Sequence, residues 1–414
     1  MPGGIRHDDL RRRNRALVIA AVRRASQPSR TEIASATGLS HSTISAISSD
    51  LIAEGILAET KGSEQITARR GRPQVALSLN PAAGAVIVAV LSLNDLSAAL
   101  IDYSGGTVAE ENRRLSTADI SREELGAELV AMLRRLTTTH SAGRRKPLRI
   151  VLAIQGITDA AARTMLWSPI TPHRDIPFAD ILEREFAIPT TAENDCNMMA
   201  VALRWRDPAR YRDDFIAILL SHGIGMGLVL KGELFTGTRS SGGEFGHMIH
   251  RPGGALCRCG RRGCVEAYAG DYAIWRNAQE KSEFSLPEDG VGIAEMQTIA
   301  ARARAEDGPE REAYREAGTA IGYGIGSLFA LIDPAPIAFV GGGTAAFDLL
   351  EPHIRAAIAE TAGGHHSDAI SFDTVADELP LILQGGAMRA LAFVDQQIFA
   401  VGLDALDLAG KEVA

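Results

Sequence analysis

The chain has 414 residues, which is too long for one ordinary hydrophobic core and suits two or three domains. Hydrophobic residues make up 46% and charged residues 23%, a composition typical of soluble globular proteins. The most apolar stretches, 82–93 and 321–332, are too short to span a bilayer, and the N-terminus has no apolar signal-peptide core. We therefore expect a cytoplasmic protein that does not enter a membrane.

The net charge of −8 is unevenly distributed along the chain. Residues 1–80 contain more Lys and Arg than Asp and Glu, whereas the remainder is acidic. A basic head on an acidic body suggests that only the head meets a polyanion. Chance scatter of charges is the alternative explanation for this asymmetry.

Three helices are predicted near the N-terminus, at 10–25, 30–37 and 41–54. Ser29 starts a capping-box pattern before the second helix, and Gly38 allows a tight turn after it. The spacing is that of a helix-turn-helix. Its small core would consist of Ile33, Ala34, Leu39, Ile44 and Ile47.

The third helix carries short polar residues at its N-terminal end, as a helix needs in order to approach base edges in the major groove. The positions predicted to contact DNA are Ser40, His41, Ser42, Ser45 and Ser49, and Thr43 is expected to face a phosphate. A three-helix head that docks a protein instead of DNA remains open.

A strand is predicted at 56–59, followed by a polar wing tip at 61–68. Arg69, Arg70 and Arg72 lie in a segment that ends in Arg-Gly-Arg-Pro, the core of minor-groove-binding AT-hooks. The same segment can serve as a basic linker, and both roles can hold at once. We assign residues 1–80 to a winged helix-turn-helix with a basic linker.

The body alternates between strands and helices, which predicts two α/β lobes at 81–200 and 201–414 with a ligand cleft between them. A glycine loop at 222–227 is predicted between two strands of the second lobe. The expected strands are 85–93, 98–102, 107–115, 149–154, 215–221, 227–231 and 337–340. The expected helices are 123–140, 179–186, 294–305 and 310–331.

His247, Cys257, Cys259 and Cys264 supply one imidazole and three thiolates within eighteen residues. Zn²⁺ favours four nitrogen and sulfur ligands in a tetrahedron, so this set predicts a structural zinc site with no open position. Three free buried thiols are the alternative. Cys196 is distant in sequence and is expected to be a small core residue.

These residues resemble the motifs of the ROK family (repressors, open reading frames and kinases). The resemblance covers nearly the whole chain and rests on E-F-G-H at 244–247, C-x-C-G-x-x-G-C-x-E at 257–266 and E-N-D-x-N at 193–197. It implies an actin-like, two-lobed sugar-kinase fold, whose C-terminal helix packs back on the first lobe. It also implies a sugar pocket lined by Asn194, Asp195, Glu244, His247 and Glu266.

In the family's kinases, the aspartate matching Asp195 is the general base, and glycine loops hold the phosphates of ATP. Here the first such loop reads Val-Leu-Ser-Leu-Asn at 90–94, and the second reads Ser-His-Gly at 221–223. We therefore expect Asp195 to be vestigial and the protein not to be an enzyme. Gln155 and Ile170 also depart from the family pattern, which suggests a less common sugar.

The sequence thus predicts a DNA-binding transcriptional regulator, a homodimer or homotetramer that represses carbohydrate genes until a sugar binds the cleft. Two alternatives stay open: a functional sugar kinase with a DNA-binding head, and a sensor whose head docks a protein. Activation is not distinguished from repression at this stage.

Overall fold

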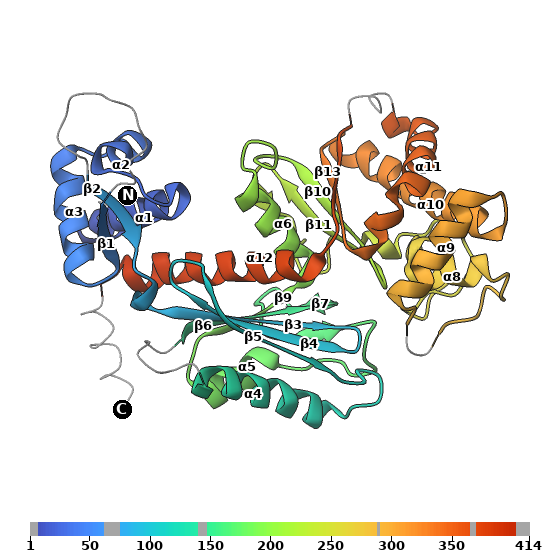
Figure 1. The fold of residues 1–414 in the computed structure, drawn as a ribbon, viewed down its shortest axis with the longest axis horizontal. Coiled ribbons are helices and arrows are strands. Elements are labelled where there is room, and N and C mark those ends of the chain that lie inside the picture. Colours follow the sequence, from blue (N-terminus) through green and yellow to red (C-terminus); the bar gives the residue numbers. More distant parts are fainter. Residues whose placement is uncertain (1–6, 62–74, 140–146, 288–289, 365–369, 403–414) are drawn as a thin grey trace.

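The computed structural model describes residues 7–61, 75–139, 147–287, 290–364 and 370–402. Figure 1 shows three parts: a small head at the N-terminal end and two α/β lobes. One long helix, α12, runs along the first lobe from the second lobe to the head. Within the described ranges, no helix combines the length and apolarity needed to cross a membrane.

The head consists of three helices and a two-stranded antiparallel sheet. Its elements are α1 (His7–Ala25), α2 (Arg30–Thr37), α3 (His41–Ala53), β1 (Leu57–Lys61) and β2 (Val75–Leu79). The predicted capping box is present, since Ser29 and Glu32 cap α2 reciprocally, and Gly38 ends that helix with φ 71°. The sequence analysis missed β2, because its five residues follow the basic segment without a turn signal.

The first lobe is built on a five-stranded sheet of order β5-β4-β3-β6-β9. Helices α4 and α5 cover one face, and α12 lies against β3 and β6 on the other. The strands are β3 (Ala85–Ser92), β4 (Asp95–Asp102), β5 (Thr107–Arg114), β6 (Pro147–Ile154) and β9 (Thr190–Asn194). The helices are α4 (Arg122–Thr139) and α5 (Phe178–Phe186), and β7 (Ile157–Thr158) and β8 (Met165–Trp167) form a small separate ladder.

The second lobe holds another five-stranded sheet, of order β12-β11-β10-β13-β14. Its strands are β10 (Phe215–Leu220), β11 (Ile224–Leu230), β12 (Glu233–Leu234), β13 (Ile337–Val340) and β14 (Phe372–Val375). Its helices are α7 (Glu266–Ala269), α8 (Asp271–Ala278), α9 (Ile293–Ala305), α10 (Pro309–Ile332) and α11 (Phe347–Ala359). Helices α6 (Asp195–Arg206) and α12 (Glu378–Phe393) pack against each other between the two sheets.

The predicted glycine loop at 222–227 is wrong in its extent, because β11 already begins at Ile224. Gly225 and Gly227 lie within this strand and face α6. A Cβ atom at either position would clash with Cys196, on its Sγ atom or its carbonyl oxygen. These glycines therefore allow the strand to approach the helix closely, and they do not form a phosphate-binding turn.

Candidate ligand pocket and metal cluster

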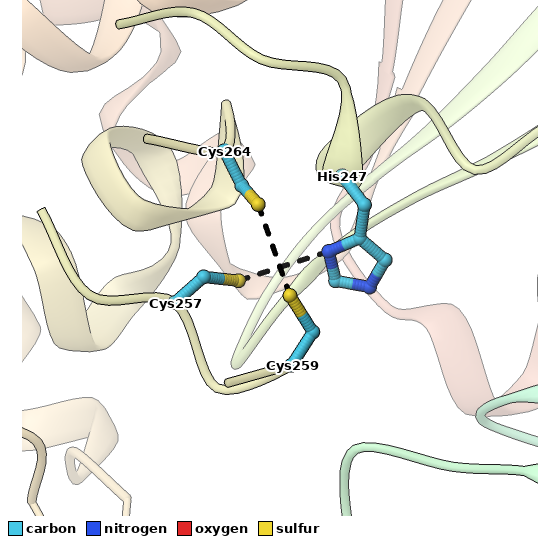
Figure 2. Close-up of side chains that lie close together, drawn as sticks. All are labelled: His247, Cys257, Cys259 and Cys264. Atoms are coloured by element: carbon cyan, nitrogen blue, oxygen red, sulfur yellow. Dashed lines mark hydrogen bonds between the residues drawn. The ribbon is translucent and has the colours of Figure 1, made fainter. Parts of the chain in front are cut away.

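The four predicted metal ligands come together in the second lobe. Their ligand atoms all lie within 4.8 Å of one another. Figure 2 shows His247 Nδ1 facing Cys257 Sγ at 3.7 Å and Cys259 Sγ facing Cys264 Sγ at 3.8 Å. Hydrogen bonding of its sulfur with the side chains of Cys257 and Cys264 lowers the pKa of Cys259. A cluster of one imidazole and three thiols, one of them readily ionised, can hold a metal ion.

The chain folds tightly around this cluster because of its local sequence. His247 ends the short 3₁₀ helix η2 (Phe245–His247), and Cys264 immediately precedes the first turn of α7. Gly260 and Gly263 have φ values of 81° and 83°, a region that side-chain-bearing residues rarely adopt. The turn between the cysteines therefore depends on glycine at both positions.

A small polar pocket of about 50 Å³ lies beside the cluster, between the lobes. It contains all five residues predicted to bind a sugar: Asn194, Asp195, Glu244, His247 and Glu266. His247 belongs to both sites, since its Nδ1 faces the thiols while its Nε2 lies 3.9 Å from Glu244 Oε2. A metal held by the cluster would fix the orientation of this pocket side chain.

Glu266 is buried and connects the pocket with the cluster. Its Oε1 accepts hydrogen bonds from Cys257 Sγ (3.3 Å) and Tyr272 Oη (3.4 Å), and its Oε2 accepts one from the amide of Ile224 (3.2 Å). Glu244 is less constrained, because no hydrogen bond to its carboxylate is found among the described residues. Burial raises the pKa of Glu244.

Asn194 and Asp195 stand at the N-terminus of α6. Asn194 is its N-cap: its Oδ1 accepts from the amide of Asn197, and its Nδ2 donates to the carbonyl of Gly156. Asp195 Oδ1 accepts from the amide of Cys196 at 2.8 Å. Burial raises the pKa of Asp195 to about 7, so its carboxyl group is only partly ionised near neutral pH.

A much larger cleft of about 930 Å³ adjoins the pocket, and Gln155, Asp195 and Leu219 line both cavities. The segment 90–94 borders this cleft as the end of β3 and a tight turn. Ser92 pairs with Asp95, and Asn94 has φ 56°, so only Leu93 and Asn94 form the turn. Such a hairpin offers no glycine cradle to a phosphate.

Two sets of relatives connect this geometry with known proteins. A model described as the ROK family matches residues 93–378, more than half of the chain. The chain belongs to the ROK family. It is 27% identical to the xylose repressor of Bacillus subtilis (strain 168) over 69% of this chain and 73% of that protein. It is 24% identical to the DNA-binding transcriptional dual regulator NagC of Escherichia coli (strain K12) over 85% of this chain and 86% of NagC.

ROK proteins that are named as enzymes also match this chain. The glucokinase of Halalkalibacterium halodurans is 30% identical over 49% of this chain and 61% of that enzyme. Among solved structures, a ROK family transcriptional regulator described as a homologue of E. coli MLC protein superimposes with a TM-score of 0.75 at 21% identity. This match covers 95% of this chain and 99% of the other, so the two proteins share a fold that includes the head.

The ROK motifs identified in the sequence did not reveal every residue that lines the pocket. Trp167, which ends β8, and Pro169 contribute to its wall, and the Trp167 ring meets His247 edge-on with centroids 5.7 Å apart. Gln155 also lines the pocket, whereas Ile170 is buried in the core of the first lobe and is not among the lining residues. Nothing in the local sequence marks Trp167, because only the lobe packing brings it opposite His247.

The predicted DNA contacts outside the basic segment at 69–72 lie on α3 or at its N-cap. Ser40 caps the helix: its Oγ accepts from the amide of Thr43 and lies 2.8 Å from Thr43 Oγ1. The exposed positions are Ser40, His41, Ser42, Ser45 and Ser49, and Thr43 is half-buried. Arg69, Arg70 and Arg72 lie outside the described residues.

Proposed function

We propose that this ROK protein is a transcriptional repressor that binds operator DNA through its head and releases it when a sugar occupies the inter-lobe pocket. The observation that carries the proposal is the union, in one chain, of an exposed polar face on α3 with a polar inter-lobe pocket, beside which residues 90–94 form a hairpin without glycine. The likeness to a xylose repressor and to NagC supports it.

The head supports binding to DNA as a winged helix-turn-helix. Helix α3 lies on the side of the head away from the body, where it is free to enter a major groove (Figure 1). Its first turn carries His41, Ser42 and Ser45, which are short or planar polar side chains. Two copies related by a two-fold axis, in a homodimer or within a tetramer, would present one such helix to each half of an operator.

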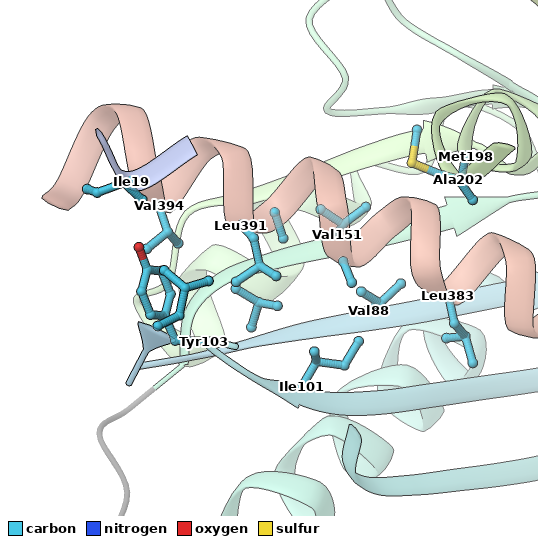
Figure 3. Close-up of a cluster of buried hydrophobic side chains, with 14 of the residues drawn as sticks. Ile19, Val88, Ile101, Tyr103, Val151, Met198, Ala202, Leu383, Leu391 and Val394 are labelled. Atoms are coloured by element: carbon cyan, nitrogen blue, oxygen red, sulfur yellow. The ribbon is translucent and has the colours of Figure 1, made fainter. Parts of the chain in front are cut away.

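Helix α12 supplies a physical route between pocket and head. At its N-terminus, Glu378 lines the large cleft and its Oε1 accepts a hydrogen bond from Ser221 Oγ at 2.9 Å. Along its length it packs on the first sheet, and its continuation η5 (Val394–Phe399) contacts α1. Figure 3 shows Val88, Leu391, Val394 and Ile19 within one buried cluster that runs from the sheet to the head.

The contact between η5 and the head is ionic as well as apolar. Arg23 on α1 forms a two-pronged pair with Asp395, at 2.7 and 2.9 Å, and Tyr103 Oη donates to the same carboxylate at 2.7 Å. Both partners of the pair are nearly fully buried, with exposed side-chain fractions of 6% and 7%. Because a rigid, buried joint transmits displacement, movement of α12 would reorient the head.

We propose that the His/Cys₃ cluster binds Zn²⁺ as a structural ion. Four protein donors would complete the tetrahedron that Zn²⁺ favours, so this metal would have no open position at which to activate water. When bound, the ion would supply only rigidity: it would fix His247, and through it the pocket, in one orientation.

A second candidate function is sugar phosphorylation. The position of Asp195 at the junction of the two cavities favours it, as does the likeness to a glucokinase. A coupled assay for ADP release across a panel of sugars separates the two functions. Turnover that disappears in Asp195→Asn would replace the repressor proposal with the kinase.

Operator binding by the full-length protein, measured with and without single sugars, tests the main proposal. We expect binding to DNA that falls steeply with salt and that weakens about 5–150-fold when one of the sugars is present. Undetectable DNA binding at low salt, or an affinity that no sugar changes, would contradict the proposal.

A further inference from the structure

The large cleft beside the sugar pocket has no role in the function proposed above. It measures about 930 Å³ and is open to the inner pocket at Asp195 and Gln155. The inner pocket, at about 50 Å³, is well below the range of about 300–1,000 Å³ that small-molecule sites occupy, whereas the cleft falls within it. A ligand that is held by the inner carboxylates and exceeds the inner pocket has room to extend past Asp195 into the cleft.

The charge of the cleft is unfavourable for a nucleotide. Five carboxylates line it, namely Asp95, Asp195, Asp271, Asp377 and Glu378. The cationic side chains that line it are Arg114 and Arg304, and Arg304 is already paired with Asp348. Carboxylates in a low-dielectric cleft repel phosphates, so a triphosphate would meet repulsion where kinases supply neutralisation.

One of these carboxylates faces the cleft without a hydrogen-bond partner. The Asp271 carboxylate accepts no hydrogen bond from the described residues, and the nearest cationic candidate, His222 Nδ1, is 3.7 Å away. His222 Nδ1 is itself buried and unpartnered in this part of the chain. Asp95, Asp377 and Glu378, by contrast, accept hydrogen bonds from Ser97, from the amide of Leu379 and from Ser221. The Asp271 side chain is 15% exposed, so a ligand hydroxyl or amine in the cleft can reach its carboxylate and donate a hydrogen bond to it.

The outer wall of the cleft is apolar. Val291, Ile293, Met296 and Ala300 lie along the start of α9 and just before it, and Ile274 comes from α8. Ile293 is 77% exposed, which is unusual for isoleucine. The faces of sugar rings and the aglycones of glycosides are apolar surfaces that such a wall can cover.

We propose that the effector of this protein is a glycoside or oligosaccharide, uncharged or cationic, whose second unit occupies the large cleft. The first sugar unit lies in the inner pocket, its linkage passes Asp195, and the second unit donates a hydrogen bond to Asp271 while packing on Ile293. This inference rests on the proposed sugar response and adds the size and charge of the ligand.

Thermal-shift and calorimetric titrations of the full-length protein test the inference with matched ligands. The probes are glucose with maltose, cellobiose, isomaltose and gentiobiose, xylose with xylobiose, and ATP as the anionic probe. We expect one disaccharide linkage to bind at least about tenfold more tightly than its monosaccharide, since other linkages point the second unit away from the cleft. ATP should leave the melting temperature unchanged.

Two substitutions locate the second unit. Ile293→Glu should cancel the gain of the disaccharide and leave monosaccharide affinity unchanged, whereas Leu331→Glu, at a position 82% exposed and outside the cleft lining, should change neither. Both positions face solvent, so these variants should fold. Asp271→Asn should weaken the disaccharide about tenfold, because it replaces one carboxyl oxygen with an amide group that cannot accept a hydrogen bond.

The outcomes separate this inference from the function on which it rests. If monosaccharides bind and no disaccharide binds more tightly, or if Ile293→Glu and Leu331→Glu behave alike, the second unit does not occupy the cleft and the inference is wrong while the sugar response stands. If ATP binds better than any sugar, the charge argument is wrong. If no sugar of either size binds, the proposed function itself fails.

Discussion

The surroundings of the two ends of α12 and its continuation η5 differ in how completely their polar groups are hydrogen-bonded. At the head end, Arg23, Tyr103 and Asp395 form a buried, mutually hydrogen-bonded network sealed by the Tyr103–Phe399 ring contact. At the cleft end, Glu378 borders a large cavity in which Asp271 has no hydrogen-bond partner among the described residues. This difference is expected of a helix that couples ligand binding to a conformational change. A ligand alters the interactions at the cleft end, and the fully hydrogen-bonded contact at the head end makes the head move with the helix.

The metal cluster at the ligand side is expected to give the largest single effect. Cys257→Ser should abolish binding of one zinc per chain and destabilise the second lobe, since structural zinc contributes on the order of 10 kcal/mol in small zinc domains. Metal content after gel filtration and the thermal midpoint measure both effects. Cys196→Ser is the matched control, because this buried thiol lies outside the cluster and its loss should leave the zinc in place.

Removal of the buried Arg23–Asp395 ion pair should give the second-largest effect. Asp395→Ala leaves Arg23 buried without its carboxylate, and removal of one partner from a buried pair costs about 3–5 kcal/mol. Urea unfolding measures the loss, and operator binding should become insensitive to sugar. Asp50→Ala removes a second Arg–Asp pair of α1, which is exposed (61% and 44%), and should cost less than about 1 kcal/mol. Equal costs for the two variants would refute a special role for the joint.

Removal of the buried charge of Asp195, which lines the cleft, should stabilise the protein at high pH. Because the pKa of Asp195 is about 7 in the folded chain and about 3.9 in unfolded chains, the folded state binds more protons between these values. Stability therefore falls as pH rises from about 4 to 7, and the full penalty applies above 7. Asp195→Asn should flatten this slope and gain up to about 4 kcal/mol at pH 8, with no gain at pH 4. Thermal midpoints across this range measure it, and a parallel pH profile for the variant would contradict the assignment.

A substitution on the exposed face of α3 should have the smallest effect, and it should change DNA binding without changing stability. Ser45→Ala should weaken specific operator binding by about 1–3 kcal/mol and change the free energy of unfolding by less than about 0.5 kcal/mol, since Ser45 is exposed on α3. Fluorescence anisotropy with specific and scrambled DNA measures it. Ser282→Ala, an exposed serine on the body, should leave DNA binding unchanged.

Features that depend on neighbours a few residues apart were predictable. The capping box of α2, the turn at Gly38 and the cluster of three cysteines with a histidine all arise within segments of at most eighteen residues. The helices and strands that were predicted lie where periodicity placed them, with ends displaced by a few residues, whereas α6, α11, β9 and β14 were not predicted. The extent of β11 was mispredicted because its glycines serve contact with α6, which lies elsewhere in the sequence.

The sequence by itself therefore indicated which parts to expect: a basic N-terminal region, a set of three cysteines with a histidine, a group of carboxylates, and a segment at 90–94 without glycine. Only the tertiary structure decided how they are connected, through pairs such as Arg23 with Asp395, which are 372 residues apart. The physical reason is that local hydrogen bonds and backbone preferences depend on residues that are close together in the sequence. The joint, the acidic cleft and the position of Trp167, in contrast, arise from packing between segments whose separation carries no sequence signal.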